Sequence, residues 1–349
     1  MISNFLYICS MKKWLLGRTP QEISKITDNL SLPSFSAKQI TNWLYVKKVS
    51  SIEQMTNLSK SAREALSLDY EVGGFSPIED SLSIDGTRKY LFPSLGGANI
   101  EAVMIPDRER ATLCISSQVG CKMGCKFCMT GRMGFSSNLT SGEIISQIIN
   151  VKESDQLTNI VYMGMGEPLD NYKEVLKSTE ILTASWGFGW SPRRITVSTI
   201  GVHAPLKDFL DNSKCHLALS VHNPFDLERA QMMPAQKAWS LEETINLIKE
   251  YDFSGQRRVS FEYIMFAGWN DNKRHADALI RMLRGLECRV NLIRFHEIPD
   301  FPLKTSPDIV IEKFKERLNN SGIIATIRAS RGQDILAACG MLSTSKQKK

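Results

Sequence analysis

The clearest pattern in the chain is an alternation of short apolar segments with amphipathic ones, which begins near residue 111. Six segments have the length and composition of strands: ATLCISS (111–117), NIVYMGMG (159–166), RITVST (194–199), CHLALSVH (215–222), RVSFEYIMF (258–266) and RVNLIRFHE (289–297). Segments between them, such as 141–153 and 240–252, repeat apolar residues at helical spacing. Alternating strands and helices predict an α/β fold with a parallel sheet, here a partial (β/α)6 barrel. A further strand at 323–330 leads into residues 331–342.

The chain before residue 111 follows a different pattern. Residues 11–75 contain short amphipathic segments of helical spacing, and a Thr-Pro pair at Thr19 is typical of a helix N-terminus. Residues 87–106 read as two strands joined at the glycine pair 96–97, which is a hairpin signal. The sequence therefore predicts a small N-terminal helical accessory domain (1–75), a β-hairpin linker (76–110) and a partial-barrel domain with a C-terminal segment (111–349).

Composition and charge add little that is specific. With 349 residues, of which 42% are hydrophobic and 23% charged, the chain is typical of a globular protein, and no apolar run approaches the roughly 20 residues that a membrane span needs. The basic pair Lys12-Lys13 follows the first apolar stretch, the reverse of a secretory signal, so we expect a cytoplasmic protein; Met11 is an alternative start. Residues 1–50 carry seven Lys or Arg against two Asp or Glu. A basic end of this kind fits phosphate contacts with RNA, and fits a solvated surface equally well.

Three of the eight cysteines, Cys121, Cys125 and Cys128, have the spacing Cys-x3-Cys-x2-Cys in GCKMGCKFCMTG. In a long chain of a reducing compartment, such a cluster indicates a metal or catalytic site rather than a disulfide scaffold. A closed zinc site needs a fourth ligand, which no nearby Cys or His supplies, although a catalytic zinc can leave that position to water. A four-iron cluster fits better, because three thiolates hold three irons and leave the fourth iron open for a substrate or cofactor.

The same spacing, with Phe127 before the last cysteine, resembles the signature of radical S-adenosylmethionine enzymes. In that superfamily a [4Fe-4S] cluster binds S-adenosylmethionine and cleaves it to a 5′-deoxyadenosyl radical. GMGEP, which contains Gly166 and Glu167, is similar to the superfamily's motif for the methionine amino group. A carboxylate beside an ammonium, and a glycine that permits close backbone approach, suit that role. Without the resemblance, GMGEP fits an ordinary turn between a strand and a helix equally well.

Further motifs narrow the resemblance. RATLCISSQVGCKMGCKFCMTG, GMGEPLDN, LALSVHNP, VNLIRFHEIP and RGQDILAACG, in this order, together resemble the RlmN family of RNA adenine-C2 methyltransferases over residues 11–342. The resemblance implies that the cluster is ligated by Cys121, Cys125 and Cys128, and that S-adenosylmethionine is bound by Gly166, Glu167, Ser198, Ser220, Val221, His222 and Asn291. Most of these residues follow predicted strands, and chemistry in such folds lies at the C-terminal ends of the strands. The loop after Asn291 differs from the family's usual form, which leaves the RNA contacts made there open.

The resemblance also implies a two-stage reaction with further catalytic residues. One S-adenosylmethionine methylates Cys339 and a second supplies the radical, so two are used per turnover. The methyl-derived carbon adds to adenine C2, and Cys114 then attacks the Cys339 sulfur, which forms a transient disulfide and releases the base. The C2 proton goes to Glu101 or to Cys114. Without the resemblance, Cys114 could also be a simple buried thiol and Cys339 a small packing residue, and Glu101 would be read as a solvated strand residue.

The resemblance implies RNA partners of two kinds. The family acts on an adenine in the peptidyl-transferase region of 23S rRNA and on the adenine next to the anticodon of certain tRNAs. A base at such a site is turned out of its loop to reach a buried active site. We also expect an electron donor such as flavodoxin or ferredoxin, and a monomer. The alternatives are a C8-methylating resistance-type paralogue, another radical enzyme with the same cluster, and a non-catalytic RNA-binding metalloprotein.

Overall fold

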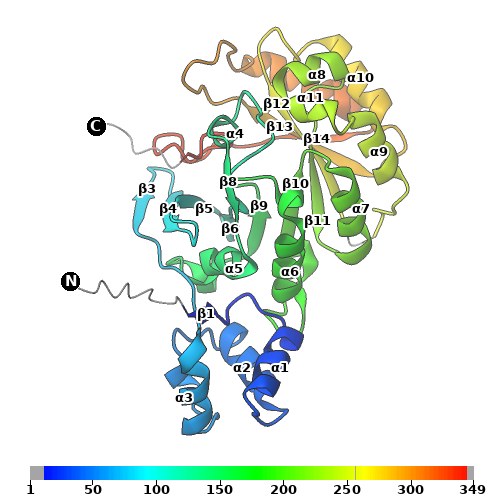
Figure 1. Cartoon of the computed structure of the whole chain (residues 1–349). Helices are drawn as coiled ribbons and strands as arrows, with labels where there is room; N and C mark the ends of the chain where they lie inside the picture. The colour runs from blue at the N-terminus through cyan, green and yellow to red at the C-terminus, as the bar shows by residue number, and fades with distance from the viewer. Residues whose placement is uncertain (1–11, 256, 344–349) are drawn as a thin grey trace, which may run out of the picture.

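A computed structural model describes residues 12–255 and 257–343 of the protein. Met11, the alternative start, and the basic residues after 343 lie outside the described residues. The main feature is one mixed sheet with the strand order β14-β13-β12-β11-β10-β9-β6-β5-β4-β3 (Figure 1). The predicted functional residues lie on this sheet, on the loops that follow its strands and on the C-terminal segment.

The second part of the chain forms the predicted partial barrel. Its strands are β6 (Arg110–Cys114), β9 (Asn159–Tyr162), β10 (Ile195–Thr199), β11 (His216–Ser220), β12 (Val259–Met265), β13 (Cys288–Arg294) and β14 (Ile324–Ile327). Each pairs in parallel with its neighbour. The crossover helices are α5 (Ser141–Ile149), α6 (Tyr172–Thr183), α7 (His203–Asn212), α8 (Asp226–Met232), α9 (Leu241–Lys249), α10 (Lys273–Leu283) and α11 (Asp308–Asn320). Within the described ranges, no helix is both long and apolar enough to cross a membrane.

The barrel strands have two different faces. Tyr162 and Tyr263 point to the helical layer, where the Tyr162 hydroxyl lies 2.6 Å from the Ser178 hydroxyl and the Tyr263 ring lies 5.3 Å from the Phe314 ring. Glu262, next to Tyr263 in β12, points to the other face, and so does its register partner Asn291 in β13, which is partly exposed. Figure 1 shows the crossover helices along the outside of the sheet. Because helices cover one face, the inner face remains available for polar chemistry.

The predicted hairpin is present and is larger than expected. Strands β4 (Arg88–Pro93) and β5 (Asn99–Asp107) pair antiparallel and are preceded by β3 (Glu79–Leu82). Strand β5 also pairs antiparallel with β6, so that Val103 lies opposite Cys114. The hairpin therefore extends the barrel sheet by three strands. The polar sequence of β3 carries no alternation, which is why the pattern did not predict this strand.

The N-terminal part contains the expected helices α1 (Pro20–Asn29), α2 (Ser36–Tyr45) and α3 (Lys60–Asp69). Thr19 caps α1 in a reciprocal capping box with Glu22, which satisfies two backbone N–H groups at the helix start. The two-residue strands β1 (Lys13–Trp14) and β2 (Tyr70–Glu71) form a separate parallel pair that is too short to leave a periodic signal. This part packs against α5 and α6, where Lys177 pairs with Glu22 at 3.0 Å.

Candidate active site

The three clustered cysteines lie on a loop whose ends are held by a short antiparallel pair, β7 (Gln118–Gly120) and β8 (Phe135–Asn138). Gly120 has a φ of +74°, and a Cβ on it would lie 1.9 Å from the carbonyl oxygen of Gly134. Directly after it, the Cys121 N–H donates to that same oxygen at 2.9 Å. A glycine is therefore required at the start of the loop, because any side chain would separate β7 from β8.

Cys121 and Cys125 are buried and Cys128 is partly exposed, and the surroundings disfavour the ionised form of all three thiols. Burial raises the pKa of Cys121 to about 12 and that of Cys125 well above its ordinary value, and negative charge on Cys128 raises both further. Among the described residues, no three His, Cys, Asp or Glu side chains surround one point closely enough to hold a single ion. Three thiolates on one buried loop need positive charge to be stable together, and the irons of a cluster supply it. The donor set therefore fits a [4Fe-4S] cluster with one open iron.

The GMGEP motif lies directly beside the cysteine loop. Gly166 has a φ of +101°, and a Cβ on it would lie 2.6 Å from the Cβ of Gln118. The Glu167 carboxylate accepts hydrogen bonds from the backbone N–H groups of Leu169 and Ile200, both at 3.1 Å. Burial nevertheless raises the pKa of Glu167 to about 7. A bound ammonium group would favour the ionised carboxylate, which fits the predicted contact with a methionine amino group.

His222 connects the end of β11 to the cysteine loop. It has a φ of +56°, and its ring lies 5.1 Å from the ring of Phe127 in an edge-to-face arrangement. Its Nδ1 accepts the Ile264 N–H at 3.1 Å, so the proton of the neutral ring lies on Nε2. Burial and the charge of Arg229 lower the pKa of His222 to about 3. The ring is therefore a neutral hydrogen-bond donor at the mouth of the barrel.

Asn291 belongs to a hydrogen-bonded row that crosses the inner face of the barrel. Its amide nitrogen donates to Glu262 at 2.7 Å, and its oxygen accepts from the Thr326 hydroxyl at 2.9 Å. Ser260 also donates to Glu262, at 2.9 Å. Sequence reasoning missed Glu262, although a lone acid in the apolar strand VSFEYIM was an available signal. Its carboxylate fixes the orientation of the Asn291 amide.

The remaining residues of the predicted cofactor site follow neighbouring strands. Ser198 lies in β10 and Ser220 ends β11; both are partly exposed, and Ser198 lies on the inner face. Val221 is fully buried, and its N–H donates to the carbonyl oxygen of Glu262 at 3.0 Å. The structure therefore gathers the predicted residues at the C-terminal ends of β10 and β11, beside the cysteine loop and GMGEP.

Glu101 lies in β5 and is buried, contrary to the solvated position that a strand glutamate usually has. Its carboxylate pairs with Lys89 at 3.1 Å and accepts the Ser343 N–H at 2.8 Å. Burial raises the pKa of Glu101, and Lys89 opposes this shift only in part. The side chains of Glu101 and Cys114 lie on the same face of the paired strands, because Val103 is the partner of Cys114 and alternate residues share a face.

The C-terminal segment runs back from β14 across the barrel towards β3 and α4 (Met129–Arg132) (Figure 1). Its first part is held at the turn between β3 and β4, where the Gly332 N–H donates to Asp85 at 2.9 Å and the Ser83 hydroxyl donates to Asp334 at 2.5 Å. These contacts place the segment over the hairpin end of the sheet.

The end of the same segment is held by the cysteine loop. The Met129 N–H donates to the carbonyl oxygen of Gly340 at 2.8 Å, and the Thr130 hydroxyl donates to that of Leu342 at 2.8 Å. Cys339 therefore lies immediately beside the last cysteine of the loop. Its side chain is exposed to solvent, although the surrounding protein raises the pKa of its thiol.

The two predicted catalytic cysteines lie close enough for the charge of Cys339 to affect Cys114. Burial raises the pKa of Cys114, and negative charge on Cys339 raises it further. Negative charge on Cys128 in turn raises the pKa of Cys339. The cation Arg328 lowers the pKa of both Cys114 and Cys339, and its guanidinium lies 3.9 Å from Glu262. Sequence reasoning missed Arg328, which lies directly after β14 and supplies positive charge where thiolates react.

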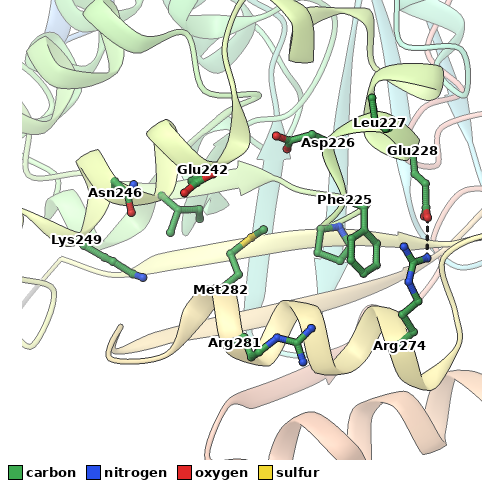
Figure 2. Close-up of a pocket in the computed structure, with 12 residues that line it drawn as sticks. Phe225, Asp226, Leu227, Glu228, Glu242, Asn246, Lys249, Arg274, Arg281 and Met282 are labelled. Atoms are coloured by element: carbon green, nitrogen blue, oxygen red, sulfur yellow. Dashed lines mark hydrogen bonds and ion pairs between the residues drawn. The ribbon is translucent and has the colours of Figure 1, made fainter.

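A cavity of about 760 Å³ lies elsewhere, between the loop after β11 and helices α8, α9 and α10. Figure 2 shows Phe225 beside Arg274, which pairs with Glu228 at 2.7 Å. The lining mixes basic and acidic side chains and contains none of the residues that the sequence predicted for the site. The chemistry described above therefore lies outside this cavity.

Comparison with known proteins defines the class. The family model of the radical SAM superfamily matches residues 115–279, and that of the ribosomal RNA large subunit methyltransferase N-terminal domain matches residues 14–72. The structure of a radical SAM methyltransferase from Sphaerobacter thermophilus has a TM-score of 0.88 at 37% identity, covering 95% of this chain and 99% of that one. The fold is that of a radical S-adenosylmethionine enzyme, whose cofactors are a [4Fe-4S] cluster and S-adenosylmethionine.

Relatives narrow the class to a family. A probable dual-specificity RNA methyltransferase RlmN of Phocaeicola vulgatus is 56% identical over 97% of both chains. The dual-specificity RNA methyltransferase RlmN of Syntrophus aciditrophicus is 41% identical over 93% of this chain and 94% of its own. The chain belongs to the RlmN family of RNA methyltransferases. The predicted family, fold class and cofactors are confirmed.

Proposed function

We propose that the protein methylates C2 of adenine in 23S rRNA and in tRNA. The relatives are named as dual-specificity RNA methyltransferases, which supports action on two kinds of RNA. The observation that supports the reaction type is the docking of the segment that carries Cys339 on the three-cysteine loop, near enough to Cys114 for the two thiols to interact electrostatically. An ordinary methyltransferase that transfers a methyl group directly to a nucleophile needs no such pair of thiols.

In this proposal Cys121, Cys125 and Cys128 ligate the cluster. S-adenosylmethionine is held by Gly166, Glu167, Ser198, Ser220, Val221, His222 and Asn291. When bound, the cluster and S-adenosylmethionine supply a methyl group and a radical that activates it. The protein supplies a carboxylate at Glu167 for the amino group and a neutral N–H at His222 for a polar atom of the cofactor. The row from Ser260 to Thr326 keeps the Asn291 amide in a single orientation.

The thiols carry and then release the methyl group. Cys339 is exposed on its segment, so its sulfur can receive a methyl group and present it to a base. After the methyl-derived carbon has bonded to adenine C2, the Cys114 thiolate attacks the Cys339 sulfur. The sulfur–sulfur bond forms, the sulfur–carbon bond breaks, and the carbon keeps the electron pair and takes up a proton to become the methyl group of the released adenine. A reductant of the thiol class must reopen the disulfide. Arg328 favours the thiolate form of both cysteines.

The C2 proton goes to Glu101 or to Cys114. The raised pKa of Glu101 favours it as an acceptor, because a carboxylate that resists ionisation holds a proton more firmly. The hydrogen bond from Ser343 and the pair with Lys89 keep the carboxylate on the same face as Cys114.

The N-terminal helices are the proposed RNA-binding part. Exposed lysines gather there: Lys12, Lys13, Lys25, Lys38 and Lys47. Phosphate contacts of this kind position an RNA without reading its bases, while the barrel takes the extruded adenine. We also propose a monomer that works in the cytoplasm, where ribosomal and transfer RNA are found, with flavodoxin or ferredoxin as the electron donor.

An anaerobic assay tests the proposal. The protein is reconstituted with iron and sulfide and given S-adenosylmethionine, a reductant and either 23S rRNA or tRNA, and the digested RNA is analysed by mass spectrometry. We expect 2-methyladenosine in both RNAs together with 5′-deoxyadenosine. Finding only 8-methyladenosine would identify the C8-methylating alternative. Zinc in place of iron, with no 5′-deoxyadenosine, would identify a non-catalytic RNA-binding metalloprotein.

A further inference from the structure

Arg229 is a buried cation with no ion-pair partner among the described residues. Its side chain belongs to α8 and is 1% exposed. Its guanidinium donates to the carbonyl oxygens of Val221 at 3.0 Å, Ser220 at 2.9 Å and Ile200 at 3.2 Å, and to the side-chain oxygen of Gln236. All four acceptors are neutral. Burying a charge without an opposite charge is costly, so its presence requires an explanation.

The nearest carboxylate is held away from Arg229 by an amide. Gln236 accepts from Arg229 and donates its own amide N–H to Asp226 at 2.7 Å. Asp226 is therefore connected to the guanidinium only through the amide of Gln236, and within the described part of the chain it forms no ion pair with Arg229. Negative charge that balances the guanidinium directly must therefore come from another neighbour of Arg229.

Helix α8 packs directly against the cysteine loop. The Lys126 N–H donates to the carbonyl oxygen of Met232 at 3.0 Å, and a Cβ on Gly124 would lie 3.8 Å from the ring of Pro234. The two residues that flank Cys125 thus lie against the last residue of α8 and the turn that follows it. In agreement with this packing, negative charge on Cys125 raises the pKa of Arg229 against the lowering effect of burial.

We propose that Arg229 is the counter-charge of the iron–sulfur cluster and makes the cluster easier to reduce. This inference rests on the proposed function, in which Cys125 is a cluster ligand. A cluster with three thiolate ligands is anionic, and it gains one more negative charge on reduction. A fixed cation in a dry setting stabilises the reduced form more than the oxidised form, which raises the midpoint potential. Arg229 would therefore be a positioning and tuning residue that touches no substrate.

The chain contains a matched control in Arg257. This arginine is also buried, at 9% exposed, and its guanidinium donates to the carbonyl oxygens of Cys215, Leu210 and Phe209. Burial lowers the pKa of both Arg229 and Arg257 to about 10. Arg257 precedes β12 and thus lies at the opposite end of the barrel from the cysteine loop. Replacing it removes a similar buried cation without changing the surroundings of the cluster.

The test is a redox titration of the reconstituted protein without S-adenosylmethionine, followed by the electron paramagnetic resonance signal of the reduced cluster. Arg229→Gln should lower the ratio of reduced to oxidised cluster at a fixed potential by about tenfold, which is about 59 mV for a one-electron couple. Arg257→Gln should leave the ratio unchanged, and Arg229→Lys should restore most of it. Gln236→Glu keeps Arg229 in place but adds a negative charge beside it, and should also lower the ratio. If Arg229→Gln does not retain a cluster, the ratio measured for Gln236→Glu tests the inference in its place.

The outcomes are distinguishable. Equal ratios in the unchanged protein, Arg229→Gln and Gln236→Glu would overturn the inference while leaving the proposed function intact. Equal losses in Arg229→Gln and Arg257→Gln would also overturn it, since any buried arginine would then have the same effect. If the unchanged protein binds no iron and sulfide, the proposed role of the three cysteines fails, and the inference fails with it.

Discussion

The ion pair between Lys89 and Glu101 allows a prediction with a defined sign. The two side chains are 18% and 5% exposed, and their charged atoms lie 3.1 Å apart. Burial still raises the pKa of Glu101, so Lys89 does not fully offset the cost of ionising this carboxyl inside the protein. A raised pKa means that the stabilising contribution of Glu101 is complete below about pH 4.5 and is lost as the pH rises through the folded-state pKa.

The two partners should therefore differ in their effect on stability. Lys89→Met leaves a buried carboxylate without its ion-pair partner. Losing one partner destabilises a protein by about 3–5 kcal/mol when the pair is fully buried and by about 0–1 kcal/mol when it is exposed. Because this pair is between these limits, we expect Lys89→Met to lower the free energy of unfolding by about 2 kcal/mol near pH 8. The cost should fall below about 1 kcal/mol near pH 5, where Glu101 can take up a proton. Glu101→Gln should stay within about 1 kcal/mol of the unchanged protein at both pH values, because the amide resembles the protonated carboxyl and still accepts from Ser343.

The measurement is urea unfolding near pH 5 and pH 8, with the cysteines kept as free thiols. The double variant Lys89→Met/Glu101→Gln is included to close a thermodynamic cycle. Lys207→Met is the control, because Lys207 pairs with Asp211 on the surface and its loss should leave the stability nearly unchanged at either pH. The reasoning would be refuted if Glu101→Gln lost about 2 kcal/mol or more near pH 8, or if the cost of Lys89→Met were the same at both pH values.

Three further predictions concern the reaction and the backbone of the site. Cys339→Ala should cleave S-adenosylmethionine but transfer no methyl group to RNA, as measured by 5′-deoxyadenosine and methyladenosine in the same sample; normal RNA methylation would remove Cys339 from the mechanism. Cys114→Ala should accumulate a covalent RNA–protein adduct that is visible on a denaturing gel. Release of methylated RNA at the normal rate would show that Cys114 does not cleave this adduct. Gly166→Ala should abolish binding of S-adenosylmethionine in equilibrium dialysis or destabilise the protein by more than about 2 kcal/mol, because the new Cβ would lie 2.6 Å from that of Gln118. Gly97→Ala is its control: Gly97 also has a positive φ but has nothing within 4 Å, so it should cost only about 1 kcal/mol from backbone strain.

Local patterns were sufficient to predict the main elements of the fold. The alternation of apolar and amphipathic segments predicted the barrel strands, because each strand must bury one face under a helix. The Thr19 signal predicted the start of α1, since a capping box involves residues close together in the chain. Strand β3 and the short pair β1–β2 were not predicted, because they are stabilised by pairing partners and have no periodicity of their own.

The site was predictable only where its residues belong to motifs. The cysteine loop and GMGEP are contiguous in sequence, and their positions after strands could be inferred. The burial of Glu101 could not, because the C-terminal segment that covers it is far away in the chain. Arg229 and Glu262 were missed for a related reason: each is a single charged residue whose role depends on partners from several elements. No local spacing marks Arg229, and the lone acid in VSFEYIM indicates a special role for Glu262 without indicating its partners.

The attachment of the C-terminal segment has a consequence for the order in which the enzyme folds. The hydrogen bonds that hold it join residues 251, 212 and 242 positions apart: Ser83 to Asp334, Thr130 to Leu342 and Ser343 to Glu101. Contacts of such long range require the intervening chain to be closed into a loop first, whereas each strand and its crossover helix are neighbours in sequence. The barrel can therefore assemble before the segment docks. Until it does, the cysteine loop and the strand ends are in place while the methyl carrier, Cys339, is still absent from the site.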